Sequence, residues 1–528
     1  MPSPTPWATR AAAGSWGASA RERRAERRAR HPVAPRKRGG PTLAERYPRI
    51  ASFRDAETFR AYLSRLQLEI PVDDRVLPAP DSPLARPLSV AGRVAGNRWC
   101  VQPMEGWDGP PAGRPSERPL RRWQRFGESG AKIVWGGEAT AVRHDGRANP
   151  NQLVIAPQTV GALARLRETL VEAHRRRHGR TADLLIGLQL THSGRFCRPN
   201  AHDRLEPRIA YHHPILDRRV GIDPDDHRPV MTDAEVDDLI GDFARAARLA
   251  VEAGFDFVDI KHCHGYLLHE FLGACNRPGR YGGDFEGRTR LLREVIGAVR
   301  REAPELLIAV RLSAFDMVPF RKGPDGVGEP EPHRHLLPYR YGFGVDPDDP
   351  TRLSLEEAAA LLGLMARLGV AAVNVTGGSP YYTPHIQRPA LFPPSDGYLP
   401  PEEPLAGVAR HVQAVRALKA AHPEMVLVGS GYTYLQEFLP NVAQAVVRQG
   451  WADAVGIGRM VLAYPWLPSD VLEGRQPDRR RICRTFSDCT TAPRNGLPSG
   501  CYPLDGHYRE SPERARLEEA KRALRTGS

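Results

Sequence analysis

The chain has 528 residues, of which 41% are hydrophobic and 7% aromatic, an ordinary composition for a soluble enzyme with a large core. No run approaches the roughly 18 uninterrupted apolar residues that a membrane span needs, so we expect a cytoplasmic protein with no membrane partner. Residues 1–40 hold ten Arg or Lys against two Glu, which leaves only +5 of the net charge of +13 for the rest of the chain. This distribution argues against a nucleic-acid partner for the folded part.

The N-terminal segment 1–42 is rich in Arg, Ala, Gly and Pro and lacks a sustained apolar pattern. This composition predicts a disordered basic tail. An Arg-rich, acid-poor start is also typical of a transit peptide or of nonspecific polyanion binding, and both alternatives stay open. Residues 43–89 then form a lead-in to the first predicted strand.

Between residues 90 and 470, short apolar runs rich in β-branched residues alternate with longer helical patterns. The eight runs are RWCVQPM (98–104), AKIVWGGEA (131–139), LLIGLQLTH (184–192), FDFVDIKH (255–262), LLIAVRLSA (306–314), AAVNVTGG (371–378), MVLVGSG (425–431) and DAVGIGR (453–459). This alternation predicts an α/β protein with a parallel sheet, and eight strands predict a (β/α)8 TIM barrel with its site at the C-terminal strand ends. Residues 471–528 are expected to form a short C-terminal extension.

Two helices carry start signals. Thr232 and Glu235 predict a capping box ahead of an amphipathic helix, and Ser354 and Glu357 predict the same device before the helical pattern EAAALLGLMARLG.

Two inserted segments are longer than routine loops between barrel elements. Residues 315–353 follow the fifth predicted strand, and residues 379–404 follow the sixth. Aromatic and His residues recur in both, which favours lids or binding loops over disordered inserts.

The most specific segment is residues 259–298, DIKHCHGYLLHEFLGACNRPGRYGGDFEGRTRLLREVIGAV. It resembles the fourth strand and following helix of the old yellow enzyme family, the FMN-binding NADH:flavin oxidoreductases. The matching residues are His264, Gly265, Tyr266, Leu267, Asn276, Arg277, Tyr281, Gly282, Gly283, Glu286 and Arg288, whereas Lys261 replaces the first His of the family pattern. With matches at most other strand ends, the resemblance covers about residues 90–470 and implies an FMN-binding barrel.

Lys261, His264 and Tyr266 fall at the end of this strand and in the turn beyond it, so we expect them to converge on one pocket. They suit a carbonyl oxygen that gains negative charge as hydride reaches the β-carbon, and Tyr266 can supply the proton to the α-carbon. A Lys–His–Cys–His metal site and a structural polar cluster are the alternatives. Lys is a poor metal ligand and alternate strand residues point to opposite faces, so we predict no metal.

The resemblance also implies residues that contact the flavin ring. Gln189 matches a Gln that hydrogen-bonds the pyrimidine side, and Arg311 matches an Arg near N1 and the C2 carbonyl, where a permanent cation suits the reduced flavin. Pro103 and Met104 match the first-strand flavin loop. Glu105 stands where Thr or Cys usually contacts the C4 carbonyl, and a carboxylate there disfavours the anionic reduced flavin unless it points away or is protonated.

A phosphate site is expected at the seventh and eighth strands. The turns after VLVGSGY and AVGIGRM offer backbone amides, and Arg459 offers a charged fork. The residues that align with the family's phosphate cradle are Ser430, Gly431, Gly458 and Arg459.

The seven cysteines are scattered and odd in number, which argues against structural disulfides. Some members of the resembling family hold a [4Fe–4S] cluster on four Cys just past the barrel. Cys483, Cys489 and Cys501 supply only three, so we expect reduced structural cysteines rather than a cluster.

The leading hypothesis is an FMN-dependent oxidoreductase that uses NAD(P)H to reduce a small activated alkene, either an α,β-unsaturated carbonyl compound or an enoyl thioester. No GxGxxG follows a strand, so nicotinamide and acceptor are expected to share one pocket. A flavin-dependent amine dehydrogenase or demethylase and a non-catalytic flavin-fold binding protein are the alternatives. Lys261 would make the pocket cationic and so favour anionic acceptors over amines. The sequence gives no indication of an oligomeric state.

Overall fold

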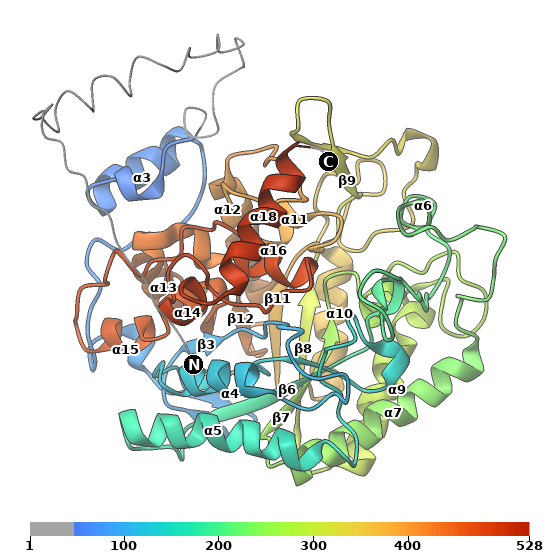
Figure 1. Ribbon diagram of the computed structural model, residues 1–528, viewed down its shortest axis with the longest axis horizontal. Helices are drawn as coiled ribbons and strands as arrows, with labels where there is room; N and C mark the ends of the chain where they lie inside the picture. The colour runs from blue at the N-terminus through green and yellow to red at the C-terminus, as the bar shows by residue number, and fades with distance from the viewer. Residues whose placement is uncertain (1–46, 527–528) are drawn as a thin grey trace, which may run out of the picture. The chain divides into compact units, whose positions relative to one another are not determined.

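Eight parallel strands close into a ring at the centre of the fold (Figure 1). Around the ring they are β3 (Trp99–Val101), β4 (Ile133–Val134), β6 (Leu185–Thr191), β7 (Phe257–His262), β8 (Leu307–Ser313), β11 (Ala372–Thr376), β12 (Leu427–Gly429) and β13 (Ala454–Ile457). Val455 pairs with Trp99 and closes the ring, while the short strand β5 (Ala139–Ala141) continues beside β6 beyond β4. The (β/α)8 barrel is therefore confirmed.

The structure is a computed structural model and describes residues 47–526. The predicted basic tail 1–42 lies outside the described residues. Within residues 47–526, no helix is long and apolar enough to cross a bilayer.

Helices cover the outside of the barrel (Figure 1). The larger ones are α4 (Glu117–Gly127), α5 (Val160–His178), α7 (Asp233–Glu252), α9 (Phe285–Glu302), α10 (Glu356–Arg367), α12 (Pro404–Ala421) and α13 (Leu439–Arg448). In α7 the buried side chains, which include Val236, Leu239 and Phe243, recur at helical spacing, so one apolar stripe packs inward.

One of the two predicted capping boxes is present. The Thr232 hydroxyl accepts from the amide of Glu235, and the Glu235 carboxylate accepts from the amide of Thr232. The box at Ser354 is wrong, because α10 begins one residue later with Leu355 as its uncapped N-cap. The Glu357 carboxylate instead accepts from the guanidinium of Arg288, and this charged contact outweighs a cap bond.

The end of the barrel at which the strands begin is sealed by a hairpin of β1 (Leu88–Val90) and β2 (Arg93–Ala95). Leu88, Val90 and Ala95 pack into a cluster to which every ring strand gives one residue. These are Cys100, Ile133, Leu185, Phe257, Ala309, Ala372, Val428 and Ala454. The interior is therefore packed, and the open end lies at the C-terminal strand ends.

The two predicted inserts differ in their structures. Residues 315–353 carry an antiparallel hairpin of β9 (Phe320–Lys322) and β10 (Gly328–Pro330), whereas residues 379–404 carry the short helix α11 (Pro384–Gln387) and end at the first residue of α12. The inserts contact each other through a bridge between Val327 and Leu399.

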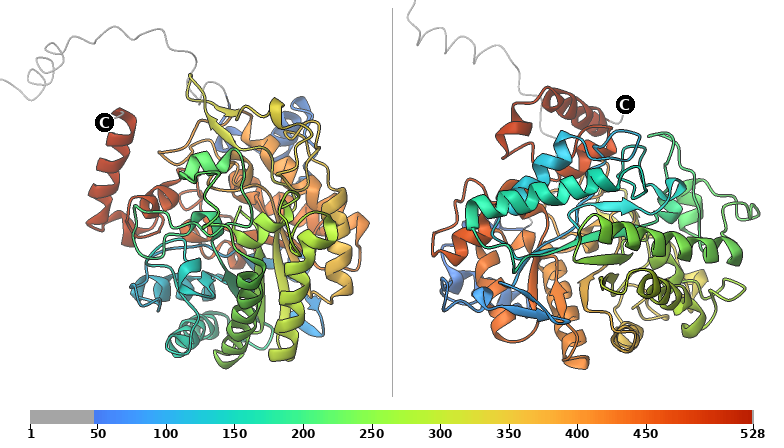
Figure 2. Two further views of the ribbon diagram at one scale, coloured as in Figure 1. Left: turned by 90° about the vertical axis from the view of Figure 1, so that its right-hand side faces the viewer. Right: turned by 90° about the horizontal axis from the view of Figure 1, so that it is seen from below.

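The described chain has further α-helices, most of them short. They are α3 (Ala56–Arg65), α6 (Leu216–Val220), α8 (Leu267–Leu272), α14 (Arg459–Ala463), α15 (Leu467–Leu472), α16 (Asp488–Arg494), α17 (Gly506–Arg509) and α18 (Glu513–Thr526). Figure 2 shows α18 in red at the edge of the molecule. Residues Ala492, Leu497, Tyr502, Tyr508 and Leu517 form a separate small core that holds the C-terminal extension together.

Candidate active site

One pocket at the C-terminal end of the barrel is lined by all twelve residues predicted for catalysis and cofactor binding. They are Pro103, Met104, Glu105, Gln189, Lys261, His264, Tyr266, Arg311, Ser430, Gly431, Gly458 and Arg459. They come from β3, β6, β7, β8, β12 and β13, or from the turns that follow these strands. What each residue contacts in a ligand stays a prediction.

Glu105 makes the contacts at one side of this pocket. Its carboxylate forms an ion pair with the ammonium of Lys261, whose side chain is only 4% exposed. The Tyr266 hydroxyl donates to Glu105 Oε2 at 2.7 Å, and the Trp107 indole N–H donates to the same oxygen at 3.0 Å. Both carboxylate oxygens are therefore in use, and the charge of Lys261 is compensated.

Tyr266 lies between charged and aromatic neighbours. The ammonium nitrogen of Lys261 is 3.8 Å from the centre of its ring, and the hydroxyl of Tyr381 is 2.9 Å from its own. Burial raises the pKa of Tyr266 well above its usual value, and the charge of Glu105 raises it further. The resting hydroxyl is therefore protonated at neutral pH and is available as a proton donor.

The backbone of His264 adopts a strained conformation. Its φ of 67° lies in the left-handed region, which few non-glycine residues adopt. The amide of His264 donates to Ser313 Oγ at 3.0 Å, and its carbonyl accepts from Ser379 Oγ at 2.7 Å. Burial lowers the pKa of the imidazole, as do the charges of Arg311 and Lys261, so the ring is neutral.

Asp259 contacts both residues predicted to face the flavin ring, the side chain of Gln189 and the backbone of Arg311. It accepts from Gln189 Nε2 at 2.5 Å and from the backbone amide of Arg311 at 2.6 Å. Burial raises the pKa of Asp259 to about 6, although both contacts favour its charged form. The Arg311 Nε atom is buried and has no hydrogen-bond partner within the described residues.

The opposite side of the pocket is cationic. Arg459 donates to the hydroxyl of Thr490 and lies 3.3 Å from the sulfur of Cys489. Arg388, from the second insert, donates to Ser487, while its Nη1 atom is buried and has no hydrogen-bond partner in the described part of the chain. Burial and the neighbouring Arg459 lower the pKa of Arg388 to about 10. Within residues 47–526 neither guanidinium forms an ion pair with a carboxylate.

Glycine is needed at two positions of the pocket lining. Gly431, which follows β12, has a φ of 88°, whereas a Cβ at Gly456, within β13, would lie 1.8 Å from Gln102 Nε2 and 2.7 Å from the carbonyl oxygen of Gly429. The Ser430 hydroxyl donates to the carbonyl of Val375 at 2.6 Å, which leaves its lone pairs for a ligand.

The family that the sequence resembles implies FMN, and the residues present fit this cofactor. Two adjacent, uncompensated guanidiniums suit a phosphate dianion, and the unpartnered nitrogens of Arg388 and Arg311 are donors without acceptors. Gln189 and Arg311 lie on strands between the phosphate side and the Tyr266 side of the pocket.

Sequence reasoning missed several residues of the pocket. Pro380, Tyr381, Gln387, Arg388 and Pro389 come from the second insert, and Cys489, Thr490, Pro493, Arg494 and Ser499 come from the C-terminal extension. The aromatic and basic content of the second insert was the available signal. The first insert, expected to act as a lid as well, gives no residue to this pocket.

The second insert and the extension are joined at the pocket. The Ser395 amide donates to the Thr491 hydroxyl at 3.2 Å, and Arg494 forms an ion pair with Asp396 at 2.8 Å.

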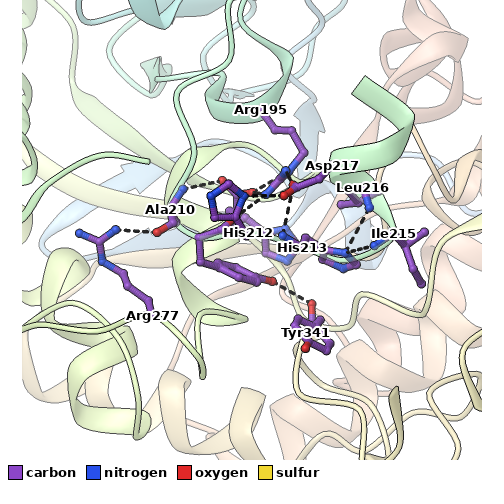
Figure 3. A network of polar contacts seen from close by, with 12 residues as sticks. Arg195, Ala210, His212, His213, Ile215, Leu216, Asp217, Arg277 and Tyr341 are labelled. Atoms are coloured by element: carbon purple, nitrogen blue, oxygen red, sulfur yellow. Dashed lines mark hydrogen bonds and ion pairs between the residues drawn. The ribbon is translucent and has the colours of Figure 1, made fainter. Parts of the chain in front are cut away.

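The network in Figure 3 fixes the loop after β6 against α8. Arg195 donates to Glu270 at 2.8 Å and to the Tyr211 carbonyl at 2.8 Å, and it forms an ion pair with Asp217. Its neighbour Phe196 stacks on Tyr381, with ring centres 3.9 Å apart.

The cysteines of the extension are free thiols. Burial raises the pKa of Cys501, and Cys483 and Cys489 lie close enough to raise it further. Within the part of the chain that the structure describes, no group of three or more His, Cys, Asp or Glu side chains is arranged to hold a metal ion.

Comparison with known proteins supports the resemblance to the old yellow enzyme family. Residues 122–327 match the model of the NADH:flavin oxidoreductase / NADH oxidase family. An NADH:flavin oxidoreductase of Gibberella zeae is 29% identical over 255 residues, 46% of this chain and 54% of the relative. An NADPH dehydrogenase of Geobacillus is 32% identical over 244 residues, 44% of this chain and 62% of the relative. The chain thus spans about half the length of the curated relatives it matches.

Solved structures match over more of the chain. Histamine dehydrogenase from Rhizobium aligns with a TM-score of 0.58 and 22% identity over 81% of this chain and 52% of its own. A 2-naphthoyl-CoA reductase aligns with a TM-score of 0.59 and 17% identity over 81% of this chain and 57% of its own. These likenesses concern the fold, whereas the sequence matches confirm the resemblance to the old yellow enzyme family.

Proposed function

We propose that the protein is an FMN-dependent oxidoreductase in which NAD(P)H provides the electrons and an activated alkene accepts them. The observation that carries the proposal is the single pocket that joins two unpaired arginines to Lys261 and Tyr266, with Gln189 and Arg311 also lining it. The sequence relatives are named as NADH:flavin oxidoreductase and NADPH dehydrogenase, which supports both the cofactor and the electron donor.

The chain's own residues would act at three places. Arg388, Arg459 and the glycine turns would hold the phosphate, while Gln189 and Arg311 would hold the ring. Bound FMN would supply a hydride to the β-carbon of the acceptor. Lys261 keeps two N–H donors beyond its contact with Glu105, and these would bind the acceptor's carbonyl oxygen as it gains negative charge.

Tyr266 would donate its proton to the α-carbon. Its hydroxyl is protonated at rest, and the hydroxyl of Tyr381 lies within hydrogen-bond distance of it. The phenolate left behind would be stabilised by the ammonium of Lys261, which lies over its ring, and destabilised by the Glu105 carboxylate 2.7 Å from its oxygen, so it would be reprotonated readily.

The half-reactions of purified protein test this assignment. Tyr266→Phe should retain FMN and be reduced by NAD(P)H normally, whereas its reoxidation by an enone should slow by roughly 10²-fold, the usual contribution of a positioned general acid. Reoxidation by oxygen should stay unchanged, because oxygen needs no proton at carbon.

Tyr381→Phe is the matched control, since it removes the adjacent phenol and keeps the proposed donor. Equal losses for enone and oxygen in Tyr266→Phe would contradict the proton-donor role. A colourless protein that cannot be reconstituted with FMN would refute the flavoenzyme assignment altogether.

Oxidation of an amine is the second candidate, because histamine dehydrogenase shares the fold. The contacts of Glu105 weigh against it. An ammonium substrate would need a carboxylate partner in the pocket, and Lys261 already binds Glu105.

A further inference from the structure

Two departures from the family pattern contact each other in this pocket. Glu105 stands where Thr or Cys is usual, Lys261 stands where His is usual, and their side chains form an ion pair although they are 156 positions apart. Their side chains are 15% and 4% exposed, so bulk water screens the pair poorly.

Each departure alone would disturb a flavin site. An uncompensated carboxylate beside the ring would disfavour the anionic reduced flavin, and an uncompensated ammonium would favour it. Together the charges of Glu105 and Lys261 compensate each other. Nearby, Asp259 accepts from the backbone amide of Arg311 at 2.6 Å, and the positive charge of Arg311 lowers the pKa of Asp259 against the effect of burial.

The ion pair also orders the proposed proton donor. One oxygen of Glu105 contacts Lys261, while the other accepts from Tyr266 at 2.7 Å and from Trp107 at 3.0 Å. Trp107, Tyr266 and Tyr381 line the same side of the pocket. An incoming acceptor therefore meets aromatic surface and a neutral pair of charges.

We propose that Glu105 and Lys261 act as one compensated unit, which holds the flavin potential near that of an uncharged site, positions Tyr266, and selects uncharged acceptors over carboxylates and ammonium compounds. This inference rests on the proposed flavin function and names its substrate class. It replaces the expectation from sequence that Lys261 makes the pocket cationic.

The potential of bound FMN tests the compensation directly. Glu105→Gln leaves a free cation and should raise the midpoint potential, whereas Lys261→Met leaves a free carboxylate and should lower it. Each shift should be worth at least about tenfold in the ratio of reduced to oxidised flavin, or ~30 mV for a two-electron couple. The double variant Glu105→Gln, Lys261→Met should return close to the original value.

A remote pair provides the control. Lys132 and Asp183 form an ion pair at 2.7 Å with side chains that are 12% and 14% exposed, and neither lines the pocket. Lys132→Met and Asp183→Asn should leave the potential unchanged. If a single pocket variant fails to fold, the isosteric double variant and the surviving single variant still give the comparison.

Acceptor preference tests the selectivity. Cyclohex-2-enone would be compared with the same ring bearing a carboxylate or an ammonium group, as kcat/KM for reoxidation. The unaltered protein should prefer the neutral ring by at least about tenfold. Measured relative to the neutral ring, preference should shift towards the carboxylate in Glu105→Gln and towards the ammonium compound in Lys261→Met, although loss of the Lys261 N–H donors should slow all three acceptors in the latter.

The outcomes distinguish a failure of the proposed function from a failure of the compensated ion pair. If no alkene reoxidises the flavin, the proposed function fails. The midpoint potentials of the three variants, each compared with that of the unaltered protein, still decide whether the two charges compensate. If both single variants shift the potential in the same direction, or neither shifts it, the compensated unit is refuted even in an active ene-reductase. A preference for the carboxylated ring in the unaltered protein would refute the selectivity.

Discussion

Asp316, in the insert after β8, is a buried carboxyl group whose only hydrogen bond among the described residues is from Tyr382, at 2.6 Å. Burial raises the pKa of Asp316 to about 7, well above its usual range, and the contact with Tyr382 offsets only part of this effect. The folded protein therefore binds a proton here that the unfolded chain releases near pH 4. Such a group stabilises the fold fully below pH ~4, and the contribution is lost as pH rises through ~7.

Asp316→Asn should remove this pH dependence. The unfolding free energy of the unaltered protein, relative to the variant, should fall between pH 4 and pH 8, because a tenfold change in proton affinity is worth about 1.4 kcal/mol. Urea unfolding at several pH values measures the difference. A difference that is constant or grows with pH would show that Asp316 is ionised in the folded protein.

Arg388 was not found from the sequence, yet among residues 47–526 it has neither a carboxylate partner nor a hydrogen-bond partner for its Nη1 atom. If it binds the FMN phosphate, Arg388→Gln should weaken FMN binding by about 1.5–3 kcal/mol, or roughly 10- to 100-fold in Kd. Riboflavin, which has no phosphate, should bind equally to both proteins. Fluorescence titration measures both ligands.

Arg494→Gln is the matched control for Arg388. It lines the same pocket, but Asp396 already compensates its charge at 2.8 Å. A smaller loss of FMN affinity is expected, since less positive charge is removed from the phosphate site. Equal effects of Arg388→Gln on FMN and riboflavin would place Arg388 away from the phosphate.

At the scale of single elements, strands were predicted well and contacts between loops were not. Each of the eight apolar runs contains a ring strand, because burial on both faces leaves continuous apolar letters in the sequence. The box at Ser354 failed because Glu357 binds Arg288, 69 positions away. The pairing of Glu105 with Lys261 was likewise invisible, although both residues were identified, since sequence patterns report neighbours along the chain.

The loop after β6 shows how elements are fixed around the site. Arg195 is 1% exposed and binds Glu270 of α8 and Asp217 of α6, whose side chains are 7% and 4% exposed (Figure 3). Removing one member of a buried ion-pair network leaves uncompensated charge. Arg195→Met should therefore lower the unfolding free energy by about 3–5 kcal/mol, as measured by denaturant unfolding.

Arg175→Met provides the comparison for an exposed pair. Arg175 and Glu172 lie within one helix turn with side chains 52% and 42% exposed, so this change should cost at most about 0.5 kcal/mol. Similar costs for the two variants would mean that water reaches the Arg195 network.

At the scale of the whole molecule, the barrel supplies the predicted residues, while the second insert and the C-terminal extension complete the pocket. The extension follows the last strand, and none of its residues was predicted for the catalytic or cofactor site. Its residues Thr490 and Cys489 instead contact Arg459, and Ser487 accepts from Arg388. Residues after the barrel carry no periodic signal that predicts where they pack, so only the structure places them at the phosphate side.

Ending the chain after Arg480 should separate the contribution of the barrel from that of the C-terminal extension. The ring strands, and the apolar cluster that seals the N-terminal end of the barrel, contain no residue beyond 480. Circular dichroism should therefore still report an α/β fold. The phosphate side would lose Thr490 and the contacts that hold Arg388 and Arg459 in place, and FMN binding should weaken by more than about tenfold, the value of one charged hydrogen bond. A shorter deletion from Glu513 onward removes α18, which lines no part of the pocket, and should leave a smaller effect. If the chain that ends at Arg480 binds FMN as tightly as the full chain, the extension covers the barrel without building the site.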